Sequence, residues 1–181
     1  MADNTLWVGV LTAGTAVVAS WVTSRGTSRA ARIQAESAAE SQQADRLRAA
    51  RRGAYVDVIE QAQRMGDLYW QVTDLPGDLA GEARREALKD LRLRLREAYA
   101  LLRHRVWVVD LEGPPEVAEA ANRLRRTTTA NYRSLEAMVR GEEGAGERFD
   151  AGYAPFWQAV LAFVAIAREA LHATTAAPPR A

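Results

Sequence analysis

The sequence contains no charged residue between Asp3 and Arg25. This uncharged segment, residues 4–24, is 21 residues long, and a helix needs about 20 residues to cross the hydrocarbon layer of a bilayer. Trp7 and Trp21 lie near its two ends, and aromatic side chains favour the membrane–water interface. The sequence therefore predicts a transmembrane helix over residues 4–24.

Two other interpretations of this segment stay open, namely a cleaved signal peptide and a buried or interfacial helix. A signal peptide begins with a basic region and ends in a small-residue cleavage site. This chain instead begins Met-Ala-Asp-Asn and carries Ser20-Trp21-Val22 near the end of the segment. An uncleaved anchor fits these features better.

Basic residues decide the expected orientation of the segment. Arg25, Arg29 and Arg32 follow it, whereas only Asp3 and the free amine precede it. Positively charged residues flanking a span are retained on the cytoplasmic side. We therefore expect a single-pass protein of the cell membrane, with the N-terminus outside and the C-terminal domain in the cytoplasm.

Small residues recur at helical spacing within residues 4–24. They form a candidate dimer face for the membrane helix, consisting of Gly9, Thr12, Ala13, Ala16 and Ser20. Such spacing lets two transmembrane helices approach closely. An ordinary Ala/Gly-rich span has the same composition, so a monomer and a homodimer both stay open.

Residues 25–52 are polar, rich in Ala, Gln, Ser and Arg, and free of proline. Their apolar members are mostly alanines, which are too small to specify a strong coiled-coil seam, so we predict a solvated helical stalk. The basic cluster Arg46–Arg52 is the best nucleic-acid candidate in the chain. No aromatic residue interleaves it and the net charge is only +1, so a nucleic-acid partner is not expected.

Four later segments carry apolar residues at three- and four-residue steps, which is the pattern of an amphipathic helix. Turn-forming stretches separate them, so the predicted helices cover residues 45–73, 82–109, 115–140 and 147–173. Their apolar stripes are Leu47, Tyr55, Val58, Ala62, Met65, Tyr69 and Val72; Leu88, Leu91, Leu95, Leu102, Val106 and Val109; Val117, Ala121, Leu124, Thr128, Tyr132, Leu135 and Met138; and Tyr153, Phe156, Val160, Phe163, Ala167 and Leu171.

Four segments of similar length joined by short loops predict an up-down-up-down antiparallel four-helix bundle over residues 45–173. The predicted fold class is therefore all-α, with an N-terminal transmembrane helix continuing into a helical stalk and this bundle. Pro155 either opens the first turn of the last helix or kinks it. Residues 174–181 contain Pro178 and Pro179 and are predicted to form a disordered tail.

This topology places several aromatic residues together at the membrane-distal end of the bundle. The candidate partner or ligand surface there consists of Tyr69, Trp70, Tyr132, Tyr153 and Trp157. Aromatic residues on helical stripes also serve simply as core, so a bulky core cap is the alternative.

Residue types that carry catalysis or bind metals are sparse. The chain has no cysteine and 2 histidines, His104 and His172. Di-iron bundles use two Glu-x-x-His motifs on facing helices, and this chain has only one, Glu169 to His172. No P-loop, G-x-G-x-x-G or serine-elbow motif occurs. We expect neither an enzyme nor a bound metal or cofactor.

Three short motifs accompany the span and the arginine-rich stalk: Arg51-Arg-Gly-Ala-Tyr55, Gly113-Pro-Pro-Glu-Val117 and Phe163-Val-Ala-Ile-Ala-Arg-Glu-Ala-Leu171. In this combination the chain resembles a loose group of uncharacterised small single-span membrane proteins with a cytosolic helical domain, from high-GC Gram-positive bacteria. The resemblance implies a helical, membrane-attached cytosolic domain. It implies no activity and no functional residues.

Together these features lead us to expect a non-catalytic, membrane-tethered helical interaction or scaffold module on the cytoplasmic face. Its expected partners are the lipid bilayer and a protein. One alternative is a small-ligand-sensing bundle with a membrane-distal aromatic pocket. The other is an extracytoplasmic envelope or lysis-type helical protein, which requires the opposite orientation.

Overall fold

The structure is a computed structural model that describes residues 3–77, 79 and 81–173, with side chains from residue 32 onward. These residues form α1 (Asp3–Thr73), α2 (Gly81–Glu112), α3 (Pro115–Arg140), α4 (Ala145–Ala151) and α5 (Tyr153–Ala173). They contain no strand, which confirms the predicted all-α class. The predicted tail lies outside the described residues, as do the side chains of the predicted span and its candidate dimer face.

The chain divides into two compact units, Met1–Arg46 and Leu47–Ala181. The boundary falls within α1, and we call residues 47–173 the helical domain. In the first unit, residues 32–46 are all exposed. Arg32 pairs with Glu36 one turn later, with 3.0 Å between Nε and Oε1. This part of α1 is a solvated helix.

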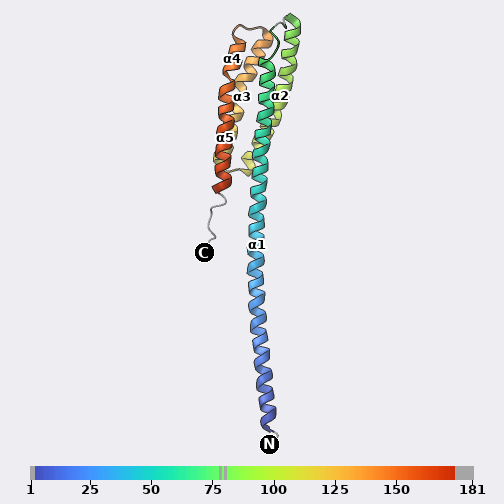
Figure 1. Cartoon of the computed structure of the whole chain (residues 1–181), viewed down its shortest axis with the longest axis vertical. Coiled ribbons are helices and arrows are strands. Elements are labelled where there is room, and N and C mark those ends of the chain that lie inside the picture. The colour runs from blue at the N-terminus through green and yellow to red at the C-terminus, as the bar shows by residue number, and fades with distance from the viewer. Residues whose placement is uncertain (1–2, 78, 80, 174–181) are drawn as a thin grey trace. The chain divides into compact units, whose positions relative to one another are not determined.

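Hydrogen bonds and ion pairs show that α1 and α2 run antiparallel, as do α2 and α3 (Figure 1). Arg51 donates to the carbonyl of Glu112 and Gln61 to that of Ala98, so residue numbers rise along α1 while they fall along α2. α2 and α3 are also antiparallel. Tyr99 of α2 contacts Arg125 of α3, and the earlier residue Arg92 contacts the later residue Glu136.

The last two helices complete the bundle by packing on both α3 and α1. The buried amide of Asn131 in α3 donates to the carbonyl of Phe149 in α4, over 3.2 Å. In α5, the ring of Phe156 lies 5.1 Å from that of Tyr69, and the ring of Phe163 lies 6.1 Å from that of Tyr55. Because both tyrosines belong to α1, α5 is antiparallel to α1.

The apolar stripes predicted from the sequence form most of the core of the helical domain. Leu47 is the exception, because it is 48% exposed. Arg51, one turn later, already contacts Glu112 at the end of α2, so α2 ends before the level of Leu47. The largest fully buried side chains include Tyr69, Phe149, Phe156, Phe163, Met65, Leu95, Leu102, Leu124 and Leu135.

The predicted helix 147–173 is wrong in one respect, because α4 and α5 are separate helices joined at Gly152. Pro155 has no backbone N–H, and its ring would clash with the carbonyl four residues earlier in an unbroken helix. The N–H of Gly152 donates to the carbonyl of Phe149 over 3.1 Å, which closes the last turn of α4. Pro155 therefore lies in the first turn of α5.

One segment of the described chain, Ala145–Ala173, is long and apolar enough to cross a membrane by length and composition. It lies at the C-terminal end of the helical domain. A core helix of a bundle has the same composition, and Phe156 and Phe163 from this segment are fully buried in the core. Packing in the core therefore accounts for the buried apolar residues of this segment, whereas Leu161 is exposed.

Candidate functional site

The aromatic residues predicted to form one surface lie in three different environments. Tyr69 is in the core, with no exposed surface. Its ring makes edge contacts with Phe149 at 5.6 Å and Phe156 at 5.1 Å, measured between ring centroids. Tyr69 therefore does not contribute to a partner or ligand surface, and for this residue the core interpretation is correct.

Three other candidates meet between α1 and α5 and form what we call the aromatic seam: Trp70, Tyr153 and Trp157. The ring of Tyr153 lies 5.2 Å from that of Trp70 and 6.2 Å from that of Trp157. Trp70 is 51% exposed, whereas Tyr153 and Trp157 are half-buried. The most exposed ring of the aromatic seam is thus the indole of Trp70.

A glycine on α1 lets Trp157 approach the helix closely. A Cβ atom at Gly66 would lie 2.6 Å from Cζ2 of Trp157, which is shorter than any ordinary carbon contact. The indole Nε1 of Trp157 is buried and has no hydrogen-bond partner among the described residues. Trp157 is therefore the residue of the aromatic seam that packs closely on α1, and Trp70 is the residue that is accessible to a partner.

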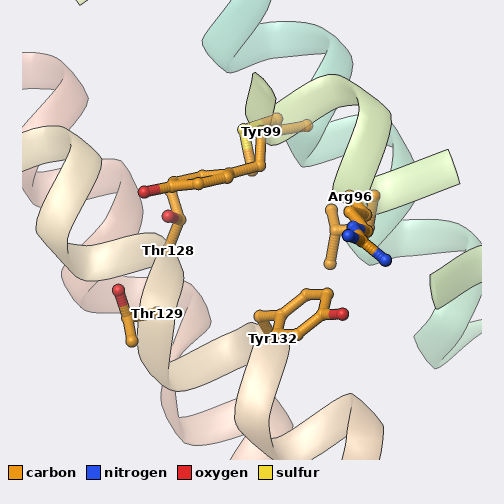
Figure 2. A pocket seen from close by; sticks show the side chains of 7 residues that line it. Arg96, Tyr99, Thr128, Thr129 and Tyr132 are labelled. Carbon is orange, nitrogen blue, oxygen red and sulfur yellow. The ribbon is translucent and has the colours of Figure 1, made fainter. Parts of the chain in front are cut away.

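Tyr132 lies apart from the aromatic seam, in a cavity between α2 and α3 (Figure 2). We call it the α2–α3 cavity. It has a volume of about 380 Å³ and is lined by Met65, Leu95, Arg96, Tyr99, Thr128, Thr129 and Tyr132. The prediction that Tyr132 joins a distal aromatic surface is therefore wrong, because α3 packs this residue toward α2.

Sequence reasoning did not single out Arg96, Tyr99 or Thr129 as candidates. The available signal was Thr128, a small polar residue on the apolar stripe of α3 between Leu124 and Leu135. A short side chain at a stripe position leaves space between the helices. The partners across that space depend on which helix is the neighbour of α3, and only the structure shows this.

The described residues hold no cluster of three or more His, Cys, Asp or Glu side chains that could bind a metal ion. His104 on α2 and His172 on α5 are both exposed. Acidic side chains form ion pairs along the helix surfaces, such as Glu82 with Arg85 at 2.6 Å. These side chains are solvated surface groups.

Burial raises the pKa of two core tyrosines, Tyr55 and Tyr69, and the larger effect is at Tyr69. The hydroxyl of Tyr69 has no hydrogen-bond partner among the described residues, and desolvation raises its pKa well above the ordinary value of 10.0. The neutral phenol is strongly favoured in the folded protein because its ionised form would be buried without a counter-charge.

We predict that the helical domain loses stability above pH 10 and that Tyr69→Phe reduces this loss. The unfolded chain releases the Tyr69 proton near pH 10, whereas the folded chain retains it. Stability therefore falls by about 1.4 kcal/mol per pH unit as the pH rises between these two pKa values. Urea unfolding at pH 9 and at pH 11 measures the loss. Equal losses in the variant and the parent chain would contradict a buried Tyr69.

Comparisons with family models, with curated proteins and with solved structures found no match to this chain.

Proposed function

We propose that this chain is a non-catalytic helical interaction module that is tethered to a membrane by residues 4–24. The observation that carries the proposal is the position of this uncharged segment in α1. The same helix, Asp3–Thr73, also supplies one wall of the helical domain. A helix held in lipid at its start would fix the domain to the bilayer surface.

The solvated part of α1 supports a tether. Residues 32–46 are all exposed, so this part of the helix gains nothing from core packing. Helices in water owe most of their stability to such packing. Arg25, Arg29 and Arg32 follow the uncharged segment and favour the cytoplasmic side. We infer a single-pass topology with the helical domain in the cytoplasm.

The aromatic seam is the surface that best suits a protein partner. Tryptophan and tyrosine are enriched among the residues that dominate binding energy at interfaces. Trp70 is half-exposed beside the ring of Tyr153, and both Tyr153 and Trp157 are packed on the core. Tethering confines the domain to a thin layer, so modest affinity for a membrane-bound partner is sufficient.

Cell fractionation tests the tether. We predict that the full-length chain stays in the membrane pellet after a carbonate wash, whereas a chain lacking residues 4–24 moves to the soluble fraction. The change should be nearly complete, because insertion of a span depends on the summed transfer energies of its residues. Full-length protein recovered wholly in the soluble fraction would refute the tether. Protease treatment of spheroplasts then reports the side, since a cytoplasmic domain is protected.

Crosslinking capture with full-length protein as bait tests the partner surface. Trp70→Ala should abolish a reproducible crosslinked partner and leave the helical signal unchanged. Trp107→Ala is the matched control, because Trp107 on α2 is also half-exposed, at 53%, but lies outside the aromatic seam. Equal capture by both variants would exclude the seam as the docking surface.

A further inference from the structure

The α2–α3 cavity lies between two contacts that hold its helices together. Beyond one end, Arg125 Nη1 donates to the hydroxyl of Tyr99 over 3.3 Å. Beyond the other end, Arg92 and Glu136 form an ion pair at 3.8 Å. These contacts hold α2 and α3 together on both sides of the space, so the cavity is present before a ligand binds.

Short side chains on α3 create the space. Thr128 is 2% exposed and occupies a stripe position where larger apolar residues precede and follow it. Its hydroxyl donates to the carbonyl of Arg125 over 2.8 Å, so the buried threonine is satisfied by its own helix. Met65 and Leu95, which are both fully buried, supply an apolar floor.

Two tyrosines form the walls of the cavity. Figure 2 shows Tyr99 on one side and Tyr132 on the other, with Arg96 toward α2 and the two threonines toward α3. Tyr99 and Tyr132 are half-buried. Aromatic walls over a floor that contains a methionine suit a flat apolar molecule, because ring faces and sulfur both make favourable contacts with aromatic groups.

The lining carries one positive charge and no negative charge. Arg96 is its only charged residue. Neighbouring arginines on α2 are paired, Arg92 with Glu136 and Arg94 with Asp90. Within the described part of the chain, Arg96 has neither a hydrogen bond nor an ion pair. An unpaired guanidinium at the edge of an apolar cavity is suited to a carboxylate, which it can bind through two hydrogen bonds.

We propose that the α2–α3 cavity binds a small planar aromatic molecule that carries a carboxylate. The ring system lies between Tyr99 and Tyr132 over the apolar floor, and the carboxylate pairs with Arg96. A volume of about 380 Å³ is near the lower end of the range for small-molecule sites. It suits one or two fused rings.

The probe for this proposal is 2-naphthoate, with the uncharged 2-naphthamide as its partner compound. Equilibrium dialysis uses the full-length chain in lipid nanodiscs, and empty nanodiscs correct for partition into lipid. We expect saturable binding of 2-naphthoate with a Kd of about 0.1–1 mM, and binding of 2-naphthamide about tenfold weaker. Absence of saturable 2-naphthoate binding up to about 5 mM, or equal affinity for the two compounds, would overturn the proposal.

Three substitutions test whether 2-naphthoate binds in the α2–α3 cavity. Arg96→Gln should weaken 2-naphthoate about tenfold while leaving 2-naphthamide unchanged. Arg94→Gln is the matched control, because Arg94 lies on the same helix and outside the cavity lining, and it should change neither affinity. Thr128→Leu fills the cavity from inside and should abolish binding of both compounds. Unchanged 2-naphthoate affinity in Arg96→Gln would overturn the proposal.

Thr129→Phe blocks the cavity in a second way, so the proposal can still be tested if the buried Thr128→Leu variant misfolds. Thr129 is exposed at the edge of the cavity, so a bulky residue there blocks the entrance without disturbing the core. It should weaken both compounds at least tenfold, with an unchanged circular dichroism spectrum. Unchanged binding in this folded variant would place the ligand outside the cavity and overturn the proposal.

Discussion

Replacing Phe163 with alanine is expected to lower the free energy of unfolding of the helical domain by about 3–5 kcal/mol. Phe163 is fully buried and packs edge-on against Tyr55 of α1, with 6.1 Å between ring centroids. Truncation removes apolar contact and leaves a cavity between α1 and α5. A domain of this size has a total stability of about 5–15 kcal/mol, so this loss is a large fraction of the total.

Leu161→Ala is the matched control for Phe163→Ala. Leu161 lies on the same helix, but it is 67% exposed, so its removal should change the free energy of unfolding by less than about 0.5 kcal/mol. Denaturant unfolding of the full-length chain in mild detergent, followed by circular dichroism, measures both variants.

The two substitutions, Phe163→Ala and Leu161→Ala, also test whether α5 lies in the core of the helical domain or in a membrane. Residues 145–173 are apolar enough to cross a membrane. Phe163 and Leu161 point to opposite faces of the helix, and in a helix surrounded by lipid both faces would meet apolar surroundings. Equal effects of the two substitutions would therefore argue for a membrane position. A difference of several kcal/mol is expected only if α5 is one side of a water-soluble core.

The helices of this chain could be predicted because local patterns determine them. Residues 115–140 were predicted as a helix and form α3, since Pro115 suits a first turn and Gly141 adopts the left-handed conformation, φ 76°, that ends a helix. Pro155 predicts either a first turn or a kink at this point, and the structure shows the first turn of α5, but the sequence does not place the joint at Gly152. Its position depends on Pro155 together with the contact from Asn131, and that contact comes from another helix.

The candidate site was less predictable, because an apolar stripe shows only that a residue points inward. It does not show which of two neighbouring helices the residue faces. The stripe pattern therefore groups Tyr132 with Trp70 and Trp157, although α3 places it next to α2. Phe149 was missed altogether because it follows a glycine-rich acidic stretch, yet it is buried against Tyr69.

Gly152→Ala is expected to lower the free energy of unfolding by about 2–3 kcal/mol. The backbone of Gly152, with φ −77° and ψ −14°, suits any residue, and alanine ordinarily stabilises a helical position. Here, however, the new Cβ atom would lie 2.4 Å from Oδ1 of Asn131. Asn131 has no exposed surface, and its Nδ2 donates to the carbonyl of Phe149, so the amide cannot move aside without breaking that bond.

A double-mutant cycle separates this clash from a general effect on the joint. Asn131→Ala alone should cost about 1–2 kcal/mol, because the carbonyl of Phe149 loses a buried donor. In the double variant, truncation of the Asn131 side chain makes room for the Cβ atom introduced by Gly152→Ala, so the combined loss should be smaller than the sum by about 1–2 kcal/mol. Urea unfolding of the four chains gives the coupling. Additive losses would mean that Gly152 and Asn131 do not contact each other, and that Pro155 alone separates α4 from α5.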